Sequence, residues 1–251
     1  MVIASEKRID KDLFVSEIVN NDYRTAEIFH KYGIDFYQGD NWSLERVCEI
    51  KGLEVLQVRK ELEESIRTIC LPNTLKFDEW NIDFLTDYIV SIHHQYLRKA
   101  LPEVKDYLVN FMHAQQNEFS YLPELFNVFS ELSSDILPHL QQEELIIFPY
   151  IRQIFHAHHS KESYAGLLVR TLRKPIENVL RDEHESVNRF LRQMRKLTNS
   201  YSVVEDASII HKVTFLKLLE IDNDLIHHMH LENDILFPRA MALEKELLEN
   251  D

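Results

Sequence analysis

Two segments of the chain repeat one pattern of side chains that can bind a metal ion. A histidine is followed by a glutamate four residues later and by a Phe-Pro pair after four further residues, once from His139 to Glu143 and once from His228 to Glu232. Side chains four residues apart lie on one face of an α-helix, so each pair can reach a single point. The copies lie 89 residues apart, which indicates an internal repeat.

A further histidine precedes each copy of the repeat. His94 and His184 lie 90 residues apart, and each lies on the apolar face of a predicted helix, as do His139 and His228. A buried carboxylate without a partner costs several kcal/mol or more, so the glutamates beside these histidines need a positive partner. Core histidines without a ligand role are the alternative interpretation, but four of them at matched offsets favour a metal site.

The donor set narrows the choice of metal. Six ligands are too many for one catalytic zinc ion, which keeps about three protein ligands and an open position. A mixed nitrogen and oxygen set also differs from the all-oxygen sets of calcium and magnesium. We expect two first-row ions bridged by both glutamates, with iron as the first candidate, manganese as the second and zinc as the third. Such a site could bind O2, peroxide or NO, or release an ion.

Three carboxylates close to these residues in sequence could support the site. Asp135 and Asp224 each precede a repeated histidine by four residues, and a ligating histidine usually donates its second N–H to a carboxylate or a carbonyl. Solvated helix surface is the alternative interpretation of both aspartates. Glu183, directly before His184, is a candidate for the lining of an access channel.

Other polar residues near the motifs are expected to lie outside the site. Glu144 and Glu185 adjoin candidate ligands in sequence, and we expect them to point elsewhere. One residue along a helix is a rotation of about 100°, so His93 and His227 are expected to flank the site or to lie at the surface. Three histidines are expected in a solvated loop: His156, His158 and His159.

The composition indicates helices that can position these side chains. The 251 residues include only 4 Gly and 7 Pro, about 4% of the chain where about 12% is usual. That is too few for the turns of an all-β or a doubly wound α/β fold. We predict an all-α protein in which long amphipathic helices at 80–112, 118–156, 175–199 and 206–247 form an up-down four-helix bundle.

A change of pattern near Pro72 predicts a domain boundary. Residues 1–74 are predicted to form a small helical domain, and residues 75–251 the bundle. Short helices are expected over 25–33, 43–52 and 54–69. Ser43 is placed as an N-cap, and Gly33 and Gly52 as helix ends.

The charge balance excludes some partners. With 28 Lys and Arg against 42 Asp and Glu, the net charge of −14 repels phosphate backbones and anionic membranes, so we expect neither nucleic acid nor membrane as a partner. Two cysteines are too few for a disulfide framework and suggest a reducing compartment. The N-terminus has no apolar signal segment, and we expect a cytoplasmic protein.

Residues 80–245 resemble the hemerythrin-like bundle, and the whole chain resembles the iron-sulfur cluster repair di-iron (RIC) proteins. The bundle resemblance rests on the two repeats that end in Phe-Pro and on the segments Ile92-His93-His94, Leu101-Pro102-Glu103 and Asp182-Glu183-His184-Glu185. The N-terminal resemblance rests on the segment from Arg24 to Phe36 and on Ser43-Leu44-Glu45 with Cys48.

The resemblance implies a non-heme di-iron centre with an oxo or hydroxo bridge, in which the two glutamates bridge the ions. Its ligands would be His94, His139, Glu143, His184, His228 and Glu232. It further implies repair of iron-sulfur clusters damaged by NO or oxidants, with damaged iron-sulfur proteins as partners and iron supplied from a labile site. Oxygen-carrying hemerythrins use five His with one Glu and one Asp, so the second H-x3-E favours the repair branch.

Two other functions stay open: an O2 or NO sensor or store, and a di-iron enzyme that reduces NO or peroxide. The residues do not decide between turnover and iron donation or fix the oligomeric state, although the resemblance favours a repair or iron-donor protein. One departure concerns the two adjacent cysteines that family members commonly carry after the equivalent of Phe36, where this chain has Tyr37 and Gln38. Cys48 is a weak substitute, because a small cysteine on an amphipathic helix is more often packing than chemistry.

Overall fold

A computed structural model of the chain describes residues 8–36, 42–66, 75–115, 118–161, 169, 176–204 and 206–249, with the main chain alone over 176–183. The described residues form helices and no strand, which confirms the predicted all-α class. Two compact units are present, one of residues 1–73 with 202–217 and the other of residues 74–201 with 218–251. The boundary predicted after residue 74 lies outside the described residues.

The first unit contains four short helices, α1 (Val15–Asn21), α2 (Thr25–Lys31), α3 (Leu44–Lys51) and α4 (Val55–Ser65). The predicted helix ends are found: the Ser43 hydroxyl accepts from the Arg46 N–H at 3.3 Å, and Gly52 ends α3 with φ 65°. A positive φ of this kind favours glycine. Helix α1 was not predicted, because seven residues give only about two turns of periodicity.

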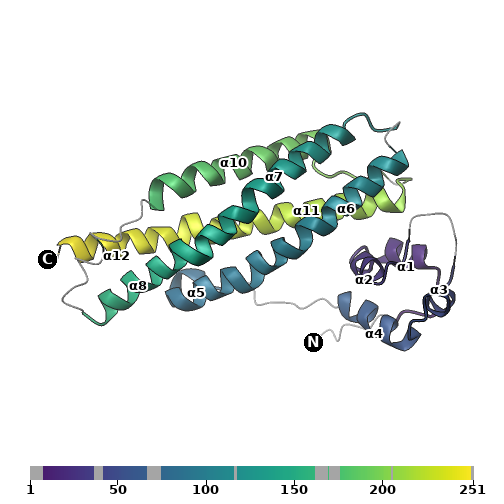
Figure 1. Ribbon diagram of the computed structural model, residues 1–251, viewed down its shortest axis with the longest axis horizontal. Coiled ribbons are helices and arrows are strands. Elements are labelled where there is room, and N and C mark those ends of the chain that lie inside the picture. The colour runs from purple at the N-terminus through teal and green to yellow at the C-terminus, as the bar shows by residue number, and fades with distance from the viewer. Residues whose placement is uncertain are drawn as a thin grey trace. The chain divides into compact units, whose positions relative to one another are not determined.

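The second unit contains four long helical rods that run alongside one another (Figure 1). After the short η1 (Phe77–Glu79), the first rod consists of α5 (Ile82–Tyr88), η2 (Ile89–His94) and α6 (Gln95–Gln115), and the second of α7 (Leu122–Gln142), η3 (Glu143–Ile147) and α8 (Phe148–His159). The third rod is α10 (Ile176–Leu197). The fourth consists of α11 (Ile209–His230), η4 (Leu231–Leu236) and α12 (Phe237–Glu249). The first residues of α11 group with the first unit. The predicted four-helix bundle is confirmed.

Three of the four rods contain a π-helix, which the sequence did not predict. η2, η3 and η4 widen the helix to an i→i+5 hydrogen-bond pattern. η3 and η4 end directly before the repeated Phe-Pro pairs. Proline has no N–H to donate, and its ring crowds the carbonyl four residues earlier, so a wider turn before Pro149 and Pro238 relieves that contact. These turns carry His94, Glu143 and Glu232.

An apolar core covers one end of the bundle. Buried side chains from α5, α8 and α12 pack into one cluster with residues of the π-helices. Phe148 and Phe237, the aromatic residues of the two repeats, belong to it and are almost fully buried. Within the described part of the chain, no helix combines the length and apolar character needed to cross a membrane.

Candidate metal centre

The bundle brings all six predicted ligands together in its interior. The π-helices contribute His94, Glu143 and Glu232, while His139, His184 and His228 lie on α7, α10 and α11. Each of the six side chains is at most 4% exposed. The repeat therefore converges on one buried point, as its spacing predicts.

These side chains form two groups that share both carboxylates. One group is His94 and His228 with Glu143 and Glu232, and the other is His139 and His184 with the same two glutamates, each with its ligand atoms within 4.8 Å of one another. The Nε2 atoms of His94 and His228 lie 3.1 Å apart, and those of His139 and His184 3.2 Å apart. Neighbouring ligands of one ion at about 2.1 Å lie about 3 Å from each other, so each pair fits one ion.

The carboxylate oxygens support the same arrangement. All four oxygens of Glu143 and Glu232 are buried and accept no hydrogen bond from a described residue. The nearest ring nitrogens are those of His139, 3.0 Å from Glu143, and of His228, 3.0 Å from Glu232. Buried acceptors without donors are costly, and two cations bridged by the carboxylates would satisfy all four. The residues present therefore fit a two-ion centre.

Hydrogen bonds at the outer ring nitrogens fix which nitrogen faces the centre. Nδ1 of His94 lies 2.8 Å from Oε1 of Glu144, and Nδ1 of His184 lies 2.8 Å from Oδ1 of Asn233. A carboxylate and an amide oxygen only accept hydrogen bonds. Both Nδ1 atoms therefore donate, which leaves the Nε2 lone pairs directed at the centre.

Each repeat thus supplies support for a histidine on another rod. Glu144 follows Glu143 as Asn233 follows Glu232, and the repeated phenylalanines stack on the same histidines, Phe148 on His94 and Phe237 on His184, with ring planes within 24°. We expected Glu144 to point away, and that was wrong: the widened turn that follows Glu143 keeps the next residue near the centre. The sequence did hold a signal for this role, because a hydrogen-bonding side chain, Glu144 or Asn233, directly follows the glutamate in each copy of the repeat.

Asp224 lies against a residue that we had set aside. It accepts a hydrogen bond from Nδ1 of His93 at 2.8 Å. Nδ1 of His228, the expected partner of Asp224, has no hydrogen-bond partner among the described residues. His93 is buried at 2% exposure, so its expected position flanking the site holds and the surface alternative does not. His227, half-buried, lies beside it with ring centroids 5.0 Å apart.

The remaining predicted residues lie at the edge of the centre or outside it. Asp135 is exposed and accepts from the Ser186 hydroxyl at 3.3 Å. Glu185 is exposed and pairs with Arg192. The side chain of Glu183 lies outside the described residues. The three histidines expected in a loop instead end helix α8: His156, His158 and His159.

Burial sets the protonation of the centre. Burial and the neighbouring His228 lower the pKa of His94 to about 4, so His94 is neutral at pH 7 and can donate its lone pair. Burial and the carboxylate of Glu232 raise the pKa of Glu143. Burial also opposes ionisation of Glu232, but the imidazoles of His228 and His184 together outweigh it and hold the pKa of Glu232 well below its usual range. A cation would supply the positive charge that these groups otherwise draw from protons.

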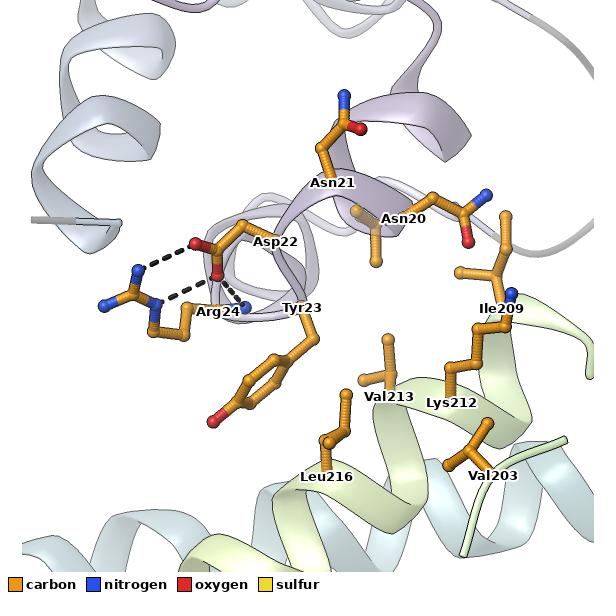
Figure 2. Close-up of a pocket in the computed structure, with 11 residues that line it drawn as sticks. Asn20, Asn21, Asp22, Tyr23, Arg24, Val203, Ile209, Lys212, Val213 and Leu216 are labelled. Atoms are coloured by element: carbon orange, nitrogen blue, oxygen red, sulfur yellow. Dashed lines mark hydrogen bonds and ion pairs between the residues drawn. The ribbon is translucent and has the colours of Figure 1, made fainter. Parts of the chain in front are cut away.

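The first unit contains no comparable set of ligands among its described residues. Cys48 is buried, and burial raises the pKa of its thiol. A raised pKa disfavours the reactive thiolate, so Cys48 fits a packing role better than a redox role. Tyr37 and Gln38 lie outside the described residues. A pocket of about 600 Å³ is lined by Asn20 and Asn21 at the end of α1 and by Ile209, Val213 and Leu216 of α11 (Figure 2).

Known proteins resemble the chain in both parts. Residues 86–240 match the family described as the hemerythrin HHE cation binding domain. The chain belongs to this family. This hemerythrin HHE protein also matches, over residues 11–66, the family ScdA_N, described as a domain of unknown function, DUF542. The family description names cation binding, and the His and Glu cluster fits it.

Relatives named for iron-sulfur cluster repair cover nearly the whole hemerythrin HHE chain. The iron-sulfur cluster repair protein ScdA of Staphylococcus haemolyticus (strain JCSC1435) is 26% identical over 91% of this chain and 98% of its own length. A probable iron-sulfur cluster repair protein of Haemophilus influenzae is 27% identical over 90% and 96%. The iron-sulfur cluster repair protein YtfE of Enterobacter sp. (strain 638) is 26% identical over 93% and 99%. The resemblance to the repair proteins is thereby confirmed.

Proposed function

We propose that this protein binds two iron ions between its four histidines and two glutamates and takes part in the repair of iron-sulfur clusters damaged by NO or oxidants. The observation that carries the proposal is the sharing of Glu143 and Glu232 by both ligand groups. Shared carboxylates hold two ions side by side, and a nitrogen and oxygen donor set of this kind suits iron. The names of the relatives supply the cluster-repair role.

Iron is the cargo in this proposal. The ligands are neutral imidazoles and carboxylates, with no thiolate among them, so Fe2+ can exchange without a change in oxidation state. The clients are damaged iron-sulfur proteins. Two cysteines without a disulfide framework suit a reducing compartment, and we place the activity in the cytoplasm.

The decisive experiment uses an iron-sulfur hydratase inactivated by NO. Anaerobic incubation with the Fe(II)-loaded protein and a sulfide source should restore hydratase activity, with a matching loss of iron from this protein. The Glu143→Ala protein, treated in the same way, should restore none. Recovery no faster than with an equal concentration of free Fe(II) would contradict the proposal. Reversible NO binding without recovery would identify a sensor or store, and steady consumption of NO with an electron donor would identify a reductase.

A further inference from the structure

A pocket of about 430 Å³ opens beside one half of the candidate metal centre. It is lined by Ser134, Asp135, Pro138 and His139 of α7 and by Ser186 and Val187 of α10, among other residues. His139 is a candidate ligand and 4% exposed, while Asp135 and Ser134 are exposed. The pocket therefore leads from oxygen-bearing side chains at the surface to one histidine of the centre.

The other half of the centre carries different residues at the matching positions of the repeat. Asp135 corresponds to Asp224, which is paired with the buried His93. Pro138 corresponds to His227, whose ring lies beside that of His93. Ser186 corresponds to Tyr96, a much larger side chain. The half with His94 and His228 is therefore packed with aromatic rings, at the positions where the half with His139 and His184 has a pocket.

The exposure of the ligands follows the same difference. His94 and His228 are 0% exposed, whereas His139 and His184 are 4% and 3% exposed. The differences are small in area, but they agree with the pocket, which reaches His139. A departing ion must meet water or other ligands as its bonds break, and the pocket at His139 provides such a space beside the pair His139 and His184.

The outer hydrogen bonds differ between the halves as well. His94 donates to the carboxylate of Glu144, which Arg98 also contacts at 2.8 Å, and His184 donates to the neutral amide oxygen of Asn233. A carboxylate partner raises the basicity of a ligating imidazole and so strengthens its bond to the metal. His184 lacks this support, so its own bond to an ion is weaker than that of His94.

We propose that the ion bound by His139 and His184 is the exchangeable one, and that it enters and leaves through the pocket at Asp135. Asp135 and the hydroxyls of Ser134 and Ser186 provide the first oxygen ligands outside the centre, after the 3.3 Å contact between Asp135 and Ser186 opens. Fe2+ leaves as Fe2+, and protons from water take up the charge on ligands it vacates. This inference rests on the proposed function and specifies which iron it supplies.

The test measures the release of iron, without any client protein. Fe(II)-loaded protein is mixed anaerobically with a chromogenic Fe(II) chelator, and the release is followed over time. Two phases of one ion each are expected. Ser186→Tyr introduces the side chain found at the matching position, Tyr96, and Asn233→Glu introduces the one found at Glu144. Each change should slow the fast phase about tenfold and leave the slow phase unchanged. Asp135→Asn should slow the fast phase by a smaller factor.

Controls separate this pathway from general effects. Glu124→Gln removes an exposed charge near the start of α7 and should leave both phases unchanged. Variants enter the comparison once their helicity and two-ion loading match the parent, and Asp135→Asn serves if Ser186→Tyr does not fold. A single phase, or a fast phase insensitive to the changes at Ser186, Asn233 and Asp135, would overturn the inference. Hydratase recovery with such a result would leave the proposed function standing. Two phases of which only the fast one responds to the substitutions, without hydratase recovery, would refute the function alone.

Discussion

Nδ1 of His94 lies 2.8 Å from the carboxylate of Glu144, a residue from a different rod of the bundle. The hydrogen bond directs the opposite ring nitrogen at the buried carboxylates of the centre. The equivalent bond, from His184 to Asn233, has the same length but a neutral acceptor. The two halves of the repeat thus hold their histidines in the same way with unequal strength.

Removal of the Glu144 carboxylate should weaken metal binding. We expect Glu144→Ala to lower the affinity for one ion by about 10-fold to 100-fold, because loss of such an outer partner leaves the imidazole free to turn and less basic. Titration of the metal-free protein with Fe(II) under anaerobic conditions measures this. Glu185→Ala removes an exposed carboxylate next to a candidate ligand and is the matched control. Equal affinities for the two variants would rule out the role given to Glu144.

The difference between the expected and observed roles of Glu144 shows where sequence reasoning ends. Helical spacing placed His139 with Glu143 and His228 with Glu232, and the structure brings them together. The same reasoning assumed 100° per residue throughout, and the π-helices break that assumption at the ligands themselves. Periodicity also could not pair His93 with Asp224, because their 131-residue separation is closed only by packing between rods.

The glutamates should prove more important for metal content than any exposed histidine. Glu143→Ala removes two buried oxygens from both ligand groups, so we expect the purified protein to lose one or both ions, and Glu232→Ala to do the same. His158→Ala alters a histidine that bonds to the exposed Glu246, outside both ligand groups, and should keep the full content. Elemental analysis of the three proteins checks this. Full metal content in both glutamate variants would exclude bridging.

The metal-free protein should lose stability from His94 as the pH falls. The pKa of His94 is lowered to about 4 in the folded chain, whereas an unfolded histidine has a pKa of about 6.5. Between these two pKa values the unfolded chain binds more protons than the folded chain. The contribution of His94 to the free energy of unfolding is therefore complete above pH 6.5 and is lost as the pH falls toward 4. The loss is on the order of 3 kcal/mol.

Comparison with a variant isolates this effect from the other ionisable groups. The free energy of unfolding in urea should fall more steeply with decreasing pH for the metal-free parent than for metal-free His94→Asn, which has no imidazole at this position. The difference between the two curves should shrink from pH 6.5 to pH 4. Parallel curves would show that His94 titrates normally.

A partly buried ion pair outside the centre should stabilise the second unit. Asp222, 1% exposed, is bound in two places by the guanidinium of Arg195 and accepts from the Tyr201 hydroxyl at 2.7 Å. Asp222→Ala leaves Arg195 and Tyr201 without their acceptor and should cost about 1–3 kcal/mol, because the Arg195 side chain is 37% exposed and water can solvate its charge. Asp234→Ala removes an exposed carboxylate from η4 and should cost less than about 1 kcal/mol. Equal midpoints in chemical denaturation would contradict this assignment.

Replacement of Gly52 should destabilise the protein because of the backbone conformation at this position. It ends α3 with φ 65°, and a Cβ built on it meets nothing within 4 Å, so steric overlap with neighbours is absent. Gly52→Ala should therefore lower the free energy of unfolding by about 1–2 kcal/mol, the cost of a left-handed conformation for a residue with a Cβ. Gly52→Asn should cost less, because asparagine adopts this conformation more readily. Urea denaturation of the three proteins gives the order, and an alanine variant as stable as the parent would show that the helix can end without the left-handed turn.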